Sequence, residues 1–121
     1  MTDALGQGDR CVALKLLDRL LAEGQAPLMI LAMMTRHFRQ MWKISELLAQ
    51  KVPQNELPKR VGASPYFLRG LMQQAGRFDR QDYRQIFTLF LETDLALKSS
   101  GGEPKMYLEK LVFEIALLGK R

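Results

Sequence analysis

The sequence predicts an all-α protein, a compact bundle or array of about five to six helices that forms a single domain over residues 1–121. Two observations lead to this prediction. Apolar residues recur at helical spacing almost throughout the chain, and no stretch alternates cleanly enough between apolar and polar residues to be a strand. A chain of 121 residues is also long enough for one domain with a real core and too short for two.

Capping residues mark the first two predicted helices. After a short turn at "TDAL", Asp9 can cap a helix with a leucine-rich apolar face, and Gly24 ends it in the left-handed conformation that glycine tolerates. Pro27 suits the first turn of the next helix, which is expected to run to about Gln50. That helix starts with "PLMILAMM", which is apolar nearly all round, so we expect its start to be buried centrally.

The later helices are predicted from the same kinds of signal. Prolines fall at first-turn positions, Ser64 is expected to cap one helix, and Asp79 with Asp82 three residues on can cap another. The expected segments are a short helix within 51–62 closed by Gly62, a helix over 64–75, a long helix from Asp79 to Lys98, and a last helix from Pro104 onward. Between the last two, "SSGGE" interrupts an otherwise continuous helical pattern.

Composition narrows the classes of function. The single cysteine, Cys11, cannot form an internal disulfide, and its place beside the first apolar stripe favours a small core residue. Nothing near the N-terminus resembles a signal peptide, and there is no run of about 18 apolar residues, so we expect a cytoplasmic protein without a membrane span. The formal charge of +5 permits contact with nucleic acid or an acidic partner, although the basic residues are spread along the chain.

The residues needed for catalysis are missing. One histidine, His37, and one cysteine cannot supply a structural zinc site, and His37 is interpreted as a boundary residue of the second helix. The segment "SSGGEPK" lacks the spacing of a phosphate-binding loop. Asp94 has Lys98 one turn on, which favours an ion pair. We therefore expect a non-enzymatic protein with no cofactor and no metal ion.

Residues 55–75 have the outline of a helix-turn-helix. A short helix, a turn with glycine and a second helix containing Leu68 and Met72 would direct Tyr66, Arg69 and Gln73 outward. Any two helices joined by a tight turn share this outline, and Arg69 is the one basic candidate there for contacting bases. Bundle packing is the simpler interpretation, and a helix-turn-helix nucleic-acid-binding module is the alternative.

Polar and charged residues gather in one narrow sector of the second helix. A solvated face is the simplest explanation, and a carboxylate in the sector dilutes the positive potential that phosphates would need. A functional role remains open for the three basic residues as a DNA-facing group. The sector contains Arg36, Arg39, Gln40, Lys43, Glu46 and Gln50.

The last helix has more apolar surface than one core contact requires. Met106, Phe113 and Leu117 form a patch on nearly the opposite side from the inward stripe. A monomer rarely leaves such a patch to water, so either the helix is internal or another subunit packs on the patch. We favour a subunit interface. The inward stripe is expected to contain Leu108, Leu111, Val112, Ile115 and Leu118.

Three segments together resemble a known family. They are "DALGQGD" at Asp3–Asp9, "RHFR" at Arg36–Arg39, and "DLALK" at Asp94–Lys98 followed by a short break containing glycine. In this order and spacing they resemble the C-terminal domain of the bacterial DNA polymerase III delta subunit, a component of the sliding-clamp loader. The resemblance extends over essentially the whole chain.

The resemblance implies a domain that assembles and does not catalyse. Delta-type proteins carry N-terminal domains of the AAA+ type and a helical C-terminal domain that joins its counterparts in the collar of the loader. By this resemblance residues 1–121 are a collar domain, a C-terminal fragment of a longer delta-like chain. Its expected partners are the gamma/tau and delta-prime type subunits. The sliding clamp would be reached only through the missing N-terminal part, and the delta subunit does not hydrolyse ATP.

The resemblance also bears on the break after Lys98. The residues at 99–102 would turn the chain so that the last helix packs antiparallel to the preceding one. In the assembled loader, Lys98 could instead face DNA, together with Arg36, Arg39 and Lys43. One lysine is a small electrostatic footprint beside the several phosphate contacts of DNA-binding proteins. The collar interpretation makes residues 55–75 ordinary bundle packing.

Overall fold

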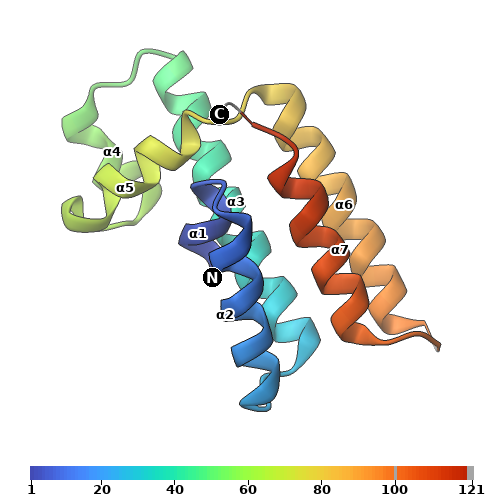
Figure 1. Cartoon of the computed structure of the whole chain (residues 1–121). Coiled ribbons are helices and arrows are strands. Elements are labelled where there is room, and N and C mark those ends of the chain that lie inside the picture. The colour runs from blue at the N-terminus through green and yellow to red at the C-terminus, as the bar shows by residue number, and fades with distance from the viewer. Residues whose placement is uncertain (100, 120–121) are drawn as a thin grey trace.

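The computed structural model describes residues 1–99 and 101–119, and within them the chain forms seven α-helices, one 3₁₀ turn and no strand (Figure 1). The predicted all-α class is confirmed. The number of helices exceeds the prediction because "TDAL", expected to be a turn, begins a short helix. The helices are α1 (Thr2–Gly6), α2 (Arg10–Ala22), α3 (Pro27–Ala49), α4 (Leu57–Val61), α5 (Pro65–Ala75), α6 (Arg80–Lys98) and α7 (Pro104–Ala116), with the 3₁₀ turn η1 (Gln54–Glu56) before α4.

Local sequence signals set most of the helix starts. The Asp9 carboxylate accepts a hydrogen bond of 3.2 Å from the backbone N–H of Val12, which caps α2 as predicted. Asp79 and Asp82 form a reciprocal capping box at the start of α6. Ser64 occupies the N-cap position of α5, but its side chain makes no capping hydrogen bond.

The four longest helices, α2, α3, α6 and α7, lie side by side, and α4 and α5 extend from one end of them (Figure 1). The last helix, α7, packs against both α2 and α6, while α3 packs against α5 and α6. The α4–α5 pair extends beside the C-terminal end of α3, and α1 lies against α2 and α3. None of the described helices combines the length and apolar character of a membrane-spanning segment.

Aromatic rings join α3 to α6 in the core. Phe38 is fully buried and meets Phe78 and Phe90 edge to face, at centroid distances of 5.6 and 5.9 Å. Trp42 stacks on Tyr83 at 5.7 Å, and the Tyr83 hydroxyl donates a hydrogen bond of 2.8 Å to the Ala75 carbonyl. This cluster holds α6 against α3, and the sides of the two helices that face away from the cluster are not covered by it.

The chain reverses direction between α6 and α7, which run antiparallel beside each other as predicted (Figure 1). Lys98 forms the expected ion pair with Asp94 at 3.0 Å, and the Tyr107 hydroxyl donates to the Gly101 carbonyl at 2.9 Å. Gly101 and Gly102 both have positive φ, as the glycines of the break were expected to provide. Ser100 of the break lies outside the described residues.

Two predictions about burial are wrong. The start of α3 is only half buried: Ile30 and Leu31 lie in the core, but Leu28 and Met29 are exposed. An apolar surface all round the helix therefore does not mean central burial here, because neighbouring helices cover one side only. Cys11, expected in the core, is exposed near the start of α2.

Candidate functional site

The three apolar residues predicted to face a partner lie on the outer side of α7. Met106, Phe113 and Leu117 are 66%, 43% and 70% exposed. We call these three residues the α7 surface. Helical spacing places them on one face, away from the inward stripe. Leu108, Leu111, Val112 and Ile115 of that stripe are buried, and Leu118 is partly buried. The helix is therefore apolar on two sides, and only one of them is covered.

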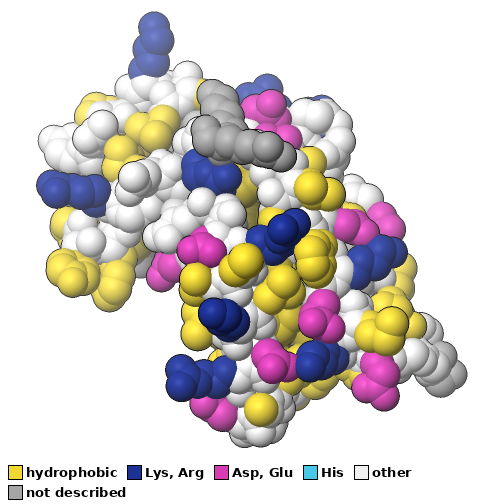
Figure 2. All heavy atoms as spheres, viewed as in Figure 1, with side chains coloured by type: hydrophobic (Ala, Val, Ile, Leu, Met, Phe, Trp, Pro, Cys, Tyr) yellow, Lys and Arg dark blue, Asp and Glu magenta, His cyan; other side chains and the backbone are white. Residues whose placement is uncertain are grey.

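Charged side chains surround the α7 surface. The guanidinium of Arg10, at the start of α2, lies 5.0 Å from the centroid of the Phe113 ring. Figure 2 shows hydrophobic side chains interleaved with basic and acidic ones over α2 and α7. At the N-terminal end of α7, Lys105 forms an ion pair of 2.6 Å with Asp18 of α2. An exposed apolar centre inside a polar rim is the usual anatomy of a protein interface.

Leu117 separates two hollows beside α7. One lies between α6 and α7, has a volume of about 470 Å³, and includes Leu89, Leu118 and the polar residues Arg84 and Glu114 in its walls. The other lies between the end of α7 and the start of α2, beside Arg10. A side chain from another molecule could enter either hollow while packing on Leu117.

The four basic candidates do not form one site. Arg36 and Arg39 are exposed on α3 and line a groove between α3 and α6. Lys43 is exposed further along α3 and does not line that groove. Lys98 lies at the end of α6, where Asp94 holds it in an ion pair. The structure thus brings two of the four together and disperses the rest.

The helix-turn-helix outline at 55–75 is present but packs as part of the bundle. Tyr66 and Arg69 point outward from α5, as predicted, and Gln73 is also exposed. Leu68 is buried as expected, with Leu71 beside it, and α5 packs on α3. The exposed side of α5 thus carries little positive charge for contact with phosphates.

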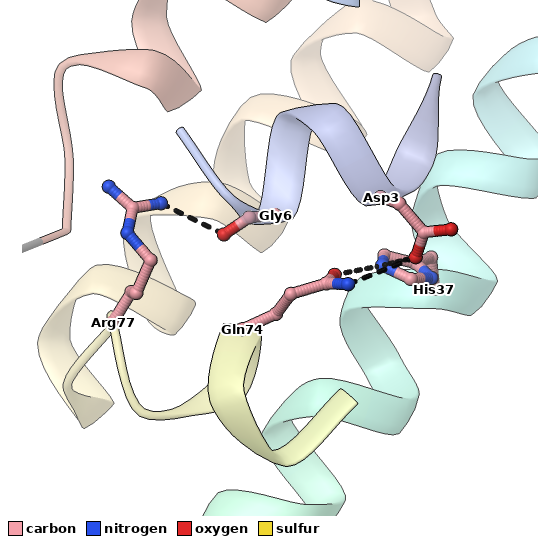
Figure 3. Close-up of polar contacts among 5 residues, drawn as sticks. All are labelled: Asp3, Gly6, His37, Gln74 and Arg77. Carbon is pink, nitrogen blue, oxygen red and sulfur yellow. Dashed lines mark hydrogen bonds and ion pairs between the residues drawn. The ribbon is translucent and has the colours of Figure 1, made fainter. Parts of the chain in front are cut away.

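Sequence reasoning missed a polar cluster that ties α1 to α3 and α5 (Figure 3). The buried Gln74 side chain donates from Nε2 to the Asp3 carboxylate at 3.0 Å, and its Oε1 accepts from His37 Nε2 at 2.6 Å. Next to it, Arg77 Nη1 donates to the Gly6 carbonyl at 2.8 Å. His37 is a boundary residue as predicted. No sequence signal could have paired Gln74 with His37 and Asp3, which lie 37 and 71 positions away.

The same contacts explain the glycines of "DALGQGD". A β-carbon on Gly6 would collide with the Gln74 side chain, and one on Gly8 would collide with the Arg77 guanidinium. Gly8 also has a φ of +79°, which residues with a β-carbon rarely adopt. The two glycines therefore allow the end of α5 to approach the turn between α1 and α2.

The ionisable groups with perturbed pKa values have structural partners. Arg80 donates two hydrogen bonds to Glu46, at 2.9 and 2.8 Å, and Trp42 donates another at 3.1 Å. These bonds, that of Arg80 first, lower the pKa of Glu46. Burial raises the pKa of the Tyr83 hydroxyl. No group of His, Cys, Asp and Glu among residues 1–99 and 101–119 is arranged to hold a metal ion.

The family follows from residues 1–115, which match the family model of the DNA polymerase III delta subunit, C-terminal domain. The chain belongs to this family. The three segments that carry the resemblance lie in α1 and the turn after it, in the middle of α3 and at the end of α6. No curated protein matches the chain.

A solved structure has the same fold as this delta-family domain. The Bacillus subtilis DNA clamp loader delta protein (YqeN) matches with a TM-score of 0.82 at 19% sequence identity. The match covers 96% of this chain and 34% of the Bacillus protein. The delta-family domain therefore spans about a third of the length of that protein, and at this identity the likeness establishes the fold alone.

Proposed function

We propose that this chain is the assembly domain of a delta-type clamp-loader subunit, which joins other loader subunits through a helical collar and so supports DNA replication in the cytoplasm. One observation carries the proposal beyond the family: α7 presents an apolar surface centred on Phe113 that the rest of the domain leaves partly exposed. An apolar helix face that its own domain leaves bare is typical of a subunit contact. The expected neighbours are the gamma/tau and delta-prime type subunits.

The domain acts without chemistry of its own in this proposal. The perturbed groups Glu46 and Tyr83 are satisfied by neighbours within the bundle, and the polar cluster at Gln74 joins helices. Contact with the sliding clamp would belong to the part of a longer delta chain that precedes this domain. DNA contact by Lys98, Arg36, Arg39 and Lys43 stays a prediction, and no feature of α4 and α5 favours the helix-turn-helix alternative.

Size-exclusion chromatography with light scattering tests the proposal. This chain is mixed with the gamma/tau and delta-prime type subunits of a loader from the same organism, and we expect it to elute in a larger stoichiometric complex. Phe113→Asp should weaken binding about thirtyfold, because truncated aromatic anchors of interfaces cost about 2 kcal/mol or more.

Phe67→Asp is the matched control. Phe67 is also an exposed phenylalanine, 64% exposed on α5 compared with 43% for Phe113, and it lies outside the α7 surface. The control should assemble like the wild type. A wild-type chain that never joins the other subunits contradicts the proposed function, and a Phe113→Asp variant that binds normally contradicts the role of the α7 surface.

A further inference from the structure

A second exposed apolar area lies between α3 and α6. Its groove has a volume of about 440 Å³. Leu31 and Phe90 form a buried floor, each 4% exposed, while Leu28 and Leu91 stand 43% and 60% exposed at its sides. We call this the α3–α6 groove. Leu28 and Leu31 belong to the start of α3, which the sequence predicted to be buried, whereas Leu91 comes from α6. The exposure of Leu28 at this groove is therefore part of the burial that the start of α3 lacks.

The groove is separate from the α7 surface. The α3–α6 groove and the hollow between α6 and α7 are both lined by residues of α6, but no α6 residue lines both. Phe87, Phe90, Leu91 and Asp94 face α3, whereas Arg84, Thr88 and Glu92 face α7. The two areas thus open on different sides of α6.

The charges of the groove are unbalanced. Arg36 and Arg39 line it, and neither guanidinium group makes a hydrogen bond or ion pair with any residue of 1–99 or 101–119. Asp94 also lines the groove, but Lys98 already holds this carboxylate at 3.0 Å. In contrast, Arg80 is paired with Glu46. The groove therefore offers two free guanidinium groups, which match carboxylates in a two-pronged geometry.

A closed ring built from a head-to-tail contact needs two different surfaces on each subunit. Resting on the proposed function, we propose that the α3–α6 groove is the second of these surfaces and docks an amphipathic helix of the other neighbouring loader subunit. Large apolar side chains of that helix would lie between Leu28 and Leu91. Aspartate or glutamate residues beside them would pair with Arg36 and Arg39.

A protein helix fits the groove better than DNA does. Phosphates would use the two arginines but would leave Leu28 and Leu91 exposed to water. The apolar side chains of an amphipathic helix would cover the two leucines, and aspartate or glutamate residues on the same face of that helix would pair with the two arginines. The apolar floor and the basic edge of the groove together therefore favour an acidic amphipathic helix as the ligand.

Pairwise binding tests the second surface. Light scattering and a binding titration measure this chain against the gamma/tau type subunit alone and against the delta-prime type subunit alone. The groove variants are Leu91→Asp and the double variant Arg36→Glu with Arg39→Glu. Each should weaken binding to one of the two subunits at least about tenfold. Phe113→Asp should weaken binding to the other.

Matched controls come from α4 and α5. Tyr66→Asp introduces one charge at an exposed apolar site, and Lys59→Glu with Arg69→Glu reverses two exposed basic residues. Both controls should bind both subunits like the wild type, and circular dichroism melts should show that all variants fold. The salt dependence of the affected contact should also reverse in the double arginine variant, because two attractive charge pairs become repulsive and salt screens the repulsion.

Each other outcome overturns the inference. If the groove variants bind both subunits normally while Phe113→Asp loses one, the groove is not an interface although the proposed function holds. If Phe113→Asp and the groove variants lose the same subunit, there is no second surface. If the wild type binds a duplex oligonucleotide, and the double arginine variant loses this binding but still binds both subunits, the ligand of the groove is DNA. If the wild-type chain alone forms a dimer that Leu91→Asp abolishes, the occupant is a second copy. A wild type that binds neither subunit overturns both proposals.

Discussion

Gln74 of α5 accepts a hydrogen bond of 2.6 Å from the ring of His37 of α3, across a sequence distance of 37 residues. The same amide group donates to Asp3 of α1. Since the amide oxygen accepts and the amide nitrogen donates, the proton of the His37 contact lies on Nε2. One buried side chain therefore joins three helices, and α1 depends on it for its position (Figure 3).

Replacing Gln74 should release α1. Gln74→Met keeps the length of the side chain but removes both hydrogen bonds, leaving the largely buried His37 without this partner. We expect the free energy of unfolding to fall by about 1–3 kcal/mol, the usual cost of an unsatisfied buried polar group. Urea unfolding measures this loss. Relative to the wild type, the hydrogen exchange of the α1 amides should accelerate more than the exchange of the α6 amides.

Gln73→Met is the control for this substitution. Gln73 is the preceding residue of the same helix and is exposed. Its replacement should change stability by no more than about 0.5 kcal/mol, as is usual for surface positions. Equal losses for the two variants would show that the hydrogen bonds of Gln74 contribute nothing beyond helix propensity.

The bond between Glu46 and Arg80 predicts a dependence of stability on pH. Hydrogen bonds from Arg80 and Trp42 lower the pKa of Glu46 in the folded protein below its ordinary value of 4.5. A carboxyl group of this kind stabilises the fold above its unfolded pKa, and the contribution is lost as pH falls through the folded pKa. Glu46→Gln removes this contribution. The wild type should therefore lose more stability on acidification than Glu46→Gln, and the two curves should converge at low pH.

Urea midpoints between neutral pH and about pH 3 give this comparison, because the range spans the titration of glutamate. Glu23→Gln serves as the control. Glu23 is exposed, and its partner Arg19 lies at a longer distance of 3.9 Å. That variant should follow the wild-type curve. Parallel curves for Glu46→Gln and the wild type would mean that Arg80 and Trp42 do not favour the ionised carboxylate.

Signals that act within one helix turn were sufficient to predict most of the fold. The caps at Asp9 and Asp79 and the proline at position 104 act locally, so they set helix starts wherever the helices pack. The helical spacing of the apolar residues was also enough to predict which side of α7 is buried and which side carries the exposed Phe113. The part of the site that could be predicted was therefore the part that lies on one helix.

Features that depend on distant partners could not be predicted. A helix of five residues such as α1 has little stability by itself, and Gln74 and Arg77 hold it from about seventy residues away. The exposure of Leu28 on α3 has the same cause. An apolar residue fits a core and a docking surface equally well, and only the placement of α6 shows that Leu28 lies at the edge of a groove.

The turn between α6 and α7 predicts unequal effects for its two adjacent glycines. Gly101 and Gly102 have φ values of +106° and +85°, so alanine at either position is strained. A β-carbon on Gly101 would meet no atom within 4 Å, whereas one on Gly102 would collide with the Tyr107 hydroxyl. We expect Gly101→Ala to cost about 1–2 kcal/mol from the backbone alone. Gly102→Ala should cost about 1 kcal/mol more, since Tyr107 must also give up its hydrogen bond to the Gly101 carbonyl.

Thermal melts of both alanine variants, repeated in a Tyr107→Phe background, separate the two causes. The phenylalanine has no hydroxyl to displace and no hydrogen bond to lose, so the difference between the two alanine variants should narrow. An unchanged difference would assign the extra cost of Gly102→Ala to the backbone or to the ring carbons of residue 107, which also lie within 3.1 Å of the added β-carbon. The turn fixes how α7 returns along α6. Either alanine that loosens the turn should therefore also weaken the proposed binding through Phe113, in proportion to the stability lost.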